Sequence, residues 1–504
     1  MLTSLIWIKE RRLFAFFLSL FFIAISLFGP PNVPVYKYFV DFDISGIVAV
    51  VTSHDVIFKT PSSVPRILLL LFGLSLLILV SKIKLNKEYN SKYLCIMSLV
   101  LSALFLLTIL TTEKLYNYLA ILLIMVSVIY YLFNYHNDLK IRERLYIVSF
   151  FMMAIFPILH TFIIPSDLSE IDNYLRFIFA IPVFLIFRHV RFSELNLLHT
   201  ISIKSILIGF VSIYFYIYST QINIEGYAST PKVFGNIALL FSILCLISFL
   251  YVYQFSRSQS YLSLLGFFMA FNAWGLSGTR SSLILIIMLI LVAFFFRNKL
   301  LQSLRIPKIS LITVVLFSSV LLFQSGSVDR MINAYESTYN YITENSEHHW
   351  EHKDSIVPRL NIWRGSWNII NDNLMFGVGL SDYNKSLENE IKIGNIPPIR
   401  KDPANVTAGM NHAHSQYLDM FAKTGIIGFL ILLFFLIMNM IIFLSSLKDR
   451  RYNIPASLGL CSTLSYAVFM LFHTVLSHQQ SVLFMTIFLS ALAGMSAMHT
   501  KRDN

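Results

Sequence analysis

Apolar segments of about twenty residues recur along most of this chain, and they constrain its fold more than any other feature. As an α-helix, a segment of this length just crosses the hydrocarbon layer of a bilayer. A helix also satisfies every backbone N–H and C=O within that layer. With 56% hydrophobic and only 13% charged residues, the chain lies outside the range of soluble domains. The sequence therefore predicts an all-α polytopic membrane protein.

We expect about 12–14 transmembrane helices. The candidate segments lie near residues 13–28, 66–81, 94–112, 116–134, 146–164, 177–187, 201–218, 236–254, 262–278, 281–296, 309–324, 425–445, 455–474 and 481–498. They predict three regions: residues 1–324 with helices 1–11, a large polar loop over residues 325–424, and residues 425–504 with helices 12–14.

Lysine and arginine positions predict the orientation, because cytoplasmic loops carry an excess of these residues. With the N-terminus inside, about 22 of them fall in cytoplasmic segments and about 7 in the short outer segments. We therefore expect both termini in the cytoplasm and the loop over residues 325–424 outside.

The composition argues against several classes of function. The net charge of +12 is spread over short loops without interleaved aromatic residues, so we expect no nucleic-acid partner. The three cysteines lie inside apolar segments and predict neither a disulfide framework nor a metal site. No nucleotide-binding motif is present, and we expect no cofactor. His348 to His352 match the H-x-x-E-H pattern of zinc peptidases, but the short loop hardly supplies the further carboxylate ligand and the soluble domain that those enzymes need.

Arginines at the outer ends of apolar segments are the first candidates for chemistry, because guanidinium groups bind phosphate oxygens bidentately and stay charged. Arg280 directly precedes an apolar segment, where a charged residue is by default a functional candidate. The alternative is an arginine that extends to the lipid phosphates. Arg176 lies four residues after Asp172, so an ion pair within one helix explains it as well as a substrate role does.

The polar loop holds the second group of candidates. Residues 359–370 predict an amphipathic helix that could lie on the membrane surface. Its apolar side is expected to comprise Leu360, Ile362, Trp363, Trp367 and Ile370. Arg359 and Arg364 flank Trp363 and are candidates for substrate binding; a solvated helix face is the alternative.

His414 stands where the loop returns to the membrane, just before Tyr417. A histidine there could take a proton from a sugar hydroxyl near neutral pH, since its ordinary pKa is about 6.5. A structural histidine is the alternative. His412 is expected to point elsewhere if the segment is extended, and to a neighbouring face if it is helical.

Several segments together resemble the O-antigen ligase and O-antigen polymerase superfamily, over roughly residues 165–440. They are, in order, Asp172 to Phe177, Gly226 to Gly235, Gly278-Thr279-Arg280-Ser281-Ser282, Arg359-Leu360-x-x-Trp363, Phe376-Gly377-Val378-Gly379, His412-Ala413-His414-Ser415-Gln416-Tyr417-Leu418-Asp419 and Thr424-Gly425-Ile426-Ile427-Gly428. The chain departs from the pattern at Ser415, where many members have asparagine, and in an additional outer segment from Gly29 to Pro65.

The resemblance implies a GT-C-like, metal-independent inverting glycosyltransferase at the periplasmic face of the bacterial inner membrane. Its donor would be a glycan on undecaprenyl diphosphate, and membrane lipids would surround it. Arg280 and Arg359 match the residues that hold the diphosphate, and His414 matches the general base or acceptor-orienting residue. Arg176 is a weaker match. Arg364, Trp363, Tyr417 and His412 are expected to contribute to substrate binding.

The acceptor stays open at this point. Transfer to the lipid A core would make the protein an O-antigen ligase, which we expect first. A second lipid-linked glycan as acceptor would make it a polymerase, and a serine or threonine of a protein would make it a protein O-oligosaccharyltransferase. The alternative of another class is a non-catalytic transporter of lipid-linked glycans. It is less favoured because intramembrane ionisable residues, mainly His160 and Lys204, are few.

Overall fold

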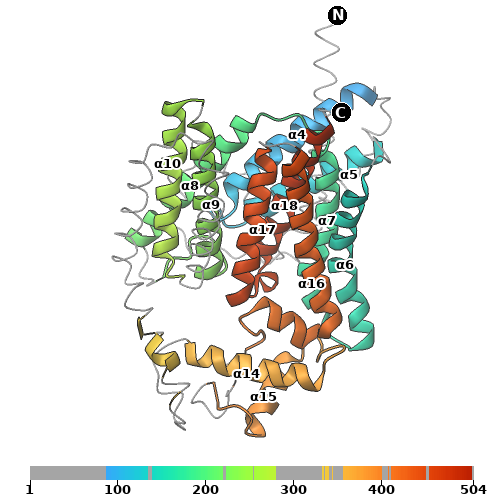
Figure 1. Ribbon diagram of the computed structural model, residues 1–504, viewed down its shortest axis with the longest axis vertical. Helices are drawn as coiled ribbons and strands as arrows, with labels where there is room; N and C mark the ends of the chain where they lie inside the picture. Colours follow the sequence, from blue (N-terminus) through green and yellow to red (C-terminus); the bar gives the residue numbers. More distant parts are fainter. Residues whose placement is uncertain are drawn as a thin grey trace, which may run out of the picture. The chain divides into compact units, whose positions relative to one another are not determined.

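The structure is a computed structural model (Figure 1). It describes residues 87–133, 139–218, 223–253, 255–279, 332–333, 335–339, 343, 356–399, 407, 410–449 and 453–501. Within these ranges every regular element is a helix. The predicted spans at residues 13–28, 66–81, 281–296 and 309–324 lie outside the described residues, as does the histidine-rich segment before residue 353.

The helices agree with the apolar segments that fall in the described ranges. They are α4 (Lys87–Thr108), α5 (Leu115–Phe133), α6 (Ile141–Ile163), η1 (Leu168–Ile171), α7 (Asp172–Phe187), α8 (Glu194–Tyr218), α9 (Pro231–Val252), α10 (Arg257–Leu276), α14 (Ile356–Asp372), α15 (Tyr383–Lys392), α16 (Gln416–Asp449), α17 (Ile454–Phe472), η2 (Val475–Ser477) and α18 (Gln479–Lys501). Among the described residues, seven of these are long and apolar enough to cross a membrane, namely α4, α6, α8, α9, α16, α17 and α18. A polytopic membrane protein is thereby supported.

The chain divides into two compact units, Met1–Ser102 with Lys114–Asn134, and Ala103–Glu113 with Tyr135–Asn504. The second unit contains α6 to α18. Its central helix α18 is buried along its whole apolar length. Close packing in this unit depends on small residues, as is usual between membrane helices. A Cβ on Gly494 of α18 would lie 2.5 Å from the Phe184 carbonyl oxygen of α7. A Cβ on Gly459 of α17 would lie 2.2 Å from the Phe443 ring of α16.

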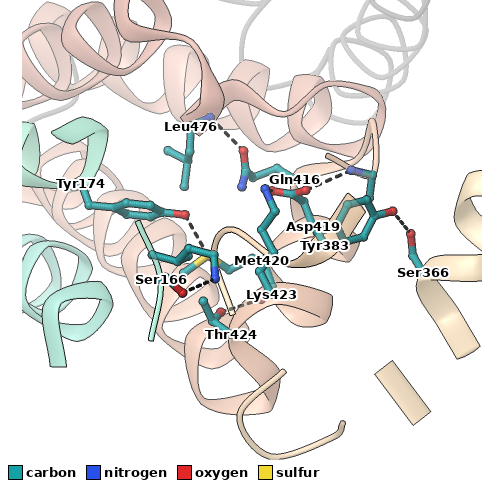
Figure 2. Close-up of polar contacts among 12 residues, drawn as sticks. Ser166, Tyr174, Ser366, Tyr383, Gln416, Asp419, Met420, Lys423, Thr424 and Leu476 are labelled. Carbon is teal, nitrogen blue, oxygen red and sulfur yellow. Dashed lines mark hydrogen bonds and ion pairs between the residues drawn. The ribbon is translucent and has the colours of Figure 1, made fainter. Parts of the chain in front are cut away.

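Loops that the charge pattern places on the outer side lie together at one end of the second unit. Ser229 N donates to Gln480 Oε1 at 2.8 Å, joining the segment before α9 to the start of α18. Leu476 N donates to Gln416 Oε1 at 2.8 Å, joining η2 to the start of α16 (Figure 2). The ends predicted to be cytoplasmic pair with one another as well, as in the buried ion pair between Arg188 and Glu143 at 2.9 Å. This pairing agrees with alternating crossings; which end is cytoplasmic stays a prediction.

The two ionisable residues noted inside apolar segments have structural partners. His160 Nε2 lies 2.7 Å from the Phe376 carbonyl oxygen. Lys204 Nζ donates to the carbonyl oxygens of Leu107 and Ile109 at the end of α4. Both side chains therefore satisfy backbone groups that would otherwise be costly to bury.

The loop over residues 325–424 contains helices. The predicted helix over 359–370 is confirmed as α14, which packs side by side with α15 and also contacts α16 (Figure 1). Residues 394–399 are not helical, as their prolines predict. The expected single apolar side of α14 is wrong, because Ile362 and Ile370 are buried while Trp367 is 55% exposed.

The buried side of α14 belongs to a small hydrophobic cluster within the loop, which we call the loop core. Its members are Ile362, Ile369, Ile370, Tyr383, Leu387, Ile396, Ile399, Ala413 and Ala422. Burial of these side chains fixes the loop against the start of α16, since each buried aliphatic side chain contributes about 1.5–3 kcal/mol. The segment before α16 is thereby a packed structure.

Helix α16 is kinked at Gly425, whose backbone (φ 68°, ψ −169°) is not helical. The turn over residues 376–379 packs against this kink. Val378 N donates to Ala422 O, and Gly379 N donates to Lys423 O, both at 2.9 Å. Backbone carbonyls that a continuous helix would bond internally are thus satisfied by the turn. The Phe-Gly-Val-Gly motif therefore holds the junction between the loop and the membrane helix.

Candidate active site

Ala413 lies between two histidines, and hydrogen bonds fix it on both sides. Its N–H donates to Asp419 Oδ1 at 3.0 Å, and its carbonyl oxygen accepts from Trp363 Nε1 at 3.0 Å. The methyl group is fully buried in the loop core. The peptide between His412 and Ala413 is therefore held by α16, and the peptide between Ala413 and His414 is held by α14.

His414 has a left-handed backbone with φ 56°, which is unusual for a residue other than glycine. This conformation costs roughly 1–2 kcal/mol and persists where the surroundings impose it, often at functional sites. His414 Nδ1 is buried and has no hydrogen-bond partner among the described residues. A buried nitrogen without a hydrogen-bond partner is costly in free energy and calls for an explanation, of which a catalytic role is one.

The two histidines lie together. The rings of His412 and His414 have centroids 4.7 Å apart and meet edge to face at 79°. Neither of the two orientations expected for His412, one for an extended segment and one for a helical segment, applies. The chain there is neither extended nor helical, and the left-handed residue at 414 turns the second ring back towards the first.

Positive charge surrounds this pair. Burial, together with the smaller effects of the charges of Lys232, His412, Arg359 and His478, lowers the pKa of His414 to about 3. Arg359 is half-buried on α14, and Lys232 stands at the start of α9. Near neutral pH His414 is therefore an uncharged imidazole in a cationic environment. Such a site can bind an anion, and the negative charge of a bound anion raises the pKa of His414 towards the range in which the ring can accept a proton.

A second histidine pair borders the site. The rings of His473 and His478 stack with centroids 4.8 Å apart, in the segment between α17 and α18. Burial, together with the charges of His412 and Lys232, lowers the pKa of His478 to about 4. His478 Nδ1 lies 3.5 Å from Ser229 Oγ. Three loops thus contribute side chains to one site: the loop before α9, the loop before α16, and the loop before α18.

Part of the chain that includes the histidine loop is similar to a known family. Residues 263–433 match the O-antigen ligase family. An uncharacterized protein of Haemophilus influenzae is 25% identical over 410 residues, which are 78% of this chain and 97% of that protein.

The matched residues contain His412, His414 and the two hydrogen bonds that fix Ala413, which we call the Ala413 clamp, whereas Lys232, His473 and His478 lie outside them. These three side chains were not singled out as site candidates from the sequence. Lys232 is one of the few basic residues in the outer segments, His473 lies at the end of the apolar segment 455–474, and His478 lies in the short polar gap between that segment and 481–498. The one available signal was that this gap falls on the same predicted side as the polar loop.

Three further residues predicted for substrate binding, Trp363, Tyr417 and Arg364, lie within the matched residues and have different contacts. Trp363 contacts the site through its bond to Ala413, which makes it part of the framework. Tyr417 donates its hydroxyl to Ala467 O at 2.9 Å, so that hydroxyl is occupied by α17. Arg364 is exposed on α14, and the described contacts do not bring it to His414. Their roles in substrate binding stay predictions.

Two further arginines complete the predicted set. Arg280 lies outside the described residues, but Thr279 before it donates to Pro231 O at 3.1 Å, next to Lys232. Arg176 forms an ion pair with Asp172 at 2.5 Å and is also bonded to Asn173. The ion pair that was the alternative for Arg176 is therefore present.

Asp419, which accepts a hydrogen bond from Ala413 N, also forms a buried ion pair. Lys423 Nζ is 3.3 Å from Asp419 Oδ2, and it stands 5.7 Å from the centre of the Tyr383 ring. Tyr383 in turn is bonded to Ser366 at 2.6 Å (Figure 2). Within the described part of the chain, no group of three or more His, Cys, Asp or Glu side chains is arranged to hold a metal ion.

Proposed function

We propose that this protein is an O-antigen ligase, which transfers a glycan from undecaprenyl diphosphate to the lipid A core at the periplasmic face of the bacterial inner membrane. The observation that carries the proposal is the uncharged His414, with an unpartnered buried nitrogen, beside the positive charges of Lys232 and Arg359. The match to the O-antigen ligase family supports the class of reaction.

The proposed reaction is a direct displacement at the anomeric carbon. The acceptor hydroxyl oxygen forms a bond to that carbon as the bond to the diphosphate oxygen breaks, and inversion follows. The hydroxyl proton passes to His414, and the electron pair of the broken bond leaves with undecaprenyl diphosphate. General base catalysis of this kind contributes typically 10²–10⁴-fold.

Lys232 and Arg359 would stabilise the departing diphosphate, together with Arg280, which the family resemblance assigns to the same task. Charge-assisted hydrogen bonds to phosphate oxygens are about twice as strong as neutral ones. As negative charge grows on the leaving group, preorganised cations stabilise the transition state more than the ground state. The reaction as proposed needs neither metal nor nucleotide, because cleavage of the bond between the sugar and the diphosphate supplies the free energy for transfer.

A defined transfer assay tests the proposal. Purified protein is incubated with undecaprenyl-diphosphate-linked glycan, with and without lipid A core, and the products are separated by mass. We expect a core-linked product that disappears in His414→Ala and Arg359→Ala. The matched control is Arg191→Ala, an exposed arginine before α8, which should keep wild-type activity.

Other products would change the assignment. Longer lipid-linked chains in the lane without lipid A core would make the protein a polymerase with the same residues in the same roles. Glycosylated protein would indicate an O-oligosaccharyltransferase. Movement of labelled lipid-linked sugar across vesicles without any transfer would indicate a transporter. Normal core transfer by His414→Ala would overturn the base assignment.

A further inference from the structure

The carboxylate of Asp419 has two partners and almost no contact with solvent. It is 2% exposed in the first turn of α16. One oxygen accepts from Ala413 N at 3.0 Å, and the other lies 3.3 Å from Lys423 Nζ (Figure 2). Neither contact is with His414 itself, yet the first holds the peptide bond that joins His412 to Ala413.

Trp363 completes the restraint from the other side. Its indole N–H donates to Ala413 O at 3.0 Å. Both peptide groups that precede His414 are therefore fixed, one by a carboxylate on α16 and one by an indole on α14. With both fixed, the left-handed φ of His414 is imposed on the chain by its neighbours.

The two restraints share one frame. From Asp419 the contacts continue through Lys423 to the Tyr383 ring, and from the Tyr383 hydroxyl to Ser366. Ser366 stands on α14, three residues after Trp363. The contacts thus form a closed circuit that links α14, α15 and α16 around Ala413, and displacement of any one member would move the histidine loop.

We propose that Asp419 is a positioning residue for glycan transfer, which holds the Ala413 peptide so that the His414 ring faces the acceptor hydroxyl. The inference rests on the proposed role of His414 as base. Asp419 does not touch the reacting atoms; its hydrogen-bond acceptor, rather than its negative charge, is what transfer requires. Misplacement of a catalytic group by about 1 Å can cost 100-fold in rate.

Two double variants separate the effect of losing the hydrogen-bond acceptor of Asp419 from the effect of losing its negative charge. Asp419→Ala alone would leave Lys423 buried without its partner, which can prevent folding. Asp419→Asn with Lys423→Gln removes both charges and keeps an oxygen for Ala413 N. Asp419→Ala with Lys423→Gln removes both charges and the oxygen. The two double variants therefore differ only at residue 419. The exposed ion pair of Glu388 and Lys392 on α15, removed by Glu388→Ala with Lys392→Gln, is the control.

We expect kcat to fall at least about tenfold in the Ala/Gln variant relative to the Asn/Gln variant, with KM for the lipid diphosphate donor within about threefold. A loss of general folding would instead change both constants and lower the thermal unfolding midpoint. The control pair should behave as wild type. Equal kcat in the two double variants would overturn the proposal.

A second measurement does not depend on activity, so it tests the positioning role even if the wild type transfers no glycan. The rate at which diethyl pyrocarbonate modifies His414 is measured by peptide mass spectrometry, with His478 as the internal reference. We expect the His414 rate to change at least about fivefold in the Ala/Gln variant and to stay within about twofold in the Asn/Gln variant. Unchanged rates in both would refute the positioning role, whereas an inactive wild type with the expected rates would refute only the proposed function.

Discussion

Gly425 lies directly against the backbone of Met375, so that a Cβ at residue 425 would come within 2.2 Å of the Met375 carbonyl oxygen. Beside this contact, Ile426 N donates to Leu374 O at 2.9 Å. The kink in α16 and the turn after α14 are thus built against each other. The same junction carries Asp419 and the histidine loop, which links the break in a membrane helix to the geometry of the candidate site.

Gly425→Ala should destabilise the protein by about 3 kcal/mol or more, because it adds a steric clash to an unfavourable positive φ. Gly394→Ala isolates the second effect: φ is 82° but no atom lies within 4 Å, so a cost of about 1–2 kcal/mol is expected. Gly275→Ala, in open space on α10, should be neutral or slightly stabilising. Thermal unfolding in detergent compares the three, and equal midpoints for the first two would contradict the packing at Gly425.

The pH dependence of transfer should differ between kcat/KM and kcat. In the free protein the pKa of His414 is about 3. The acid limb of the pH profile of kcat/KM, where the value falls because His414 becomes protonated, should therefore lie well below pH 6. A bound diphosphate places negative charge near the ring and raises its pKa. The acid limb of kcat should therefore lie at higher pH than that of kcat/KM. Initial rates between pH 4 and pH 8, at low and saturating donor, should show a fall of kcat at acid pH while kcat/KM stays level; coincident profiles would argue against an anion next to His414.

Lys232→Ala should raise KM for the donor about 10-fold to 100-fold, as expected for the loss of one hydrogen bond from a charged group. It should also raise the pKa of His414, since the charge of Lys232 lowers it, and so move the acid limb of kcat/KM upwards. Lys92→Ala, at an exposed position on α4, is the matched control. An unchanged KM would remove Lys232 from the anion site.

Stability should decrease on mild acidification. His414 and His478 have folded pKa values of about 3 and about 4, below the ordinary 6.5. Between about pH 6.5 and pH 4 the unfolded chain therefore binds protons that the folded protein does not, and the free energy of unfolding falls as pH falls. Above pH 6.5 this contribution is fully present. The unfolding midpoint of His478→Gln should depend less steeply on pH than that of the wild type, whereas Arg191→Gln should keep the wild-type slope.

Lys204→Met tests whether the buried lysine within α8 serves transport. Its side-chain nitrogen bonds carbonyls at the end of α4, so its loss should cost about 1–3 kcal/mol of stability. Glycan transfer at a permissive temperature should be unchanged. A selective loss of lipid-linked sugar movement across vesicles, with normal stability, would instead favour the transporter alternative.

The apolar segments alone predicted the all-helical membrane class and the positions of the long apolar helices, because burial in lipid dictates about twenty apolar residues per crossing wherever the segment lies. The helix over 359–370 followed from local periodicity in the same way. The resemblance of the loop motifs predicts roles for His414 and Arg359, and the match over residues 263–433 supports the resemblance to the family.

Only the tertiary structure brought Lys232, His473 and His478 to the histidines of the loop. These side chains come from three loops far apart in the sequence, and no local pattern encodes a contact across about 240 residues. The ring contact of His412 with His414 likewise depends on a left-handed residue that the surrounding packing imposes. The sequence by itself predicted the apolar helices and showed which are long and apolar enough to cross a membrane, since both follow from short-range hydrophobicity; it did not predict α15. The tertiary structure decided which polar residues meet. The kink at Gly425 and the hydrogen bonds on Ala413 set the position of the histidine loop, and these contacts exist only once distant helices have packed.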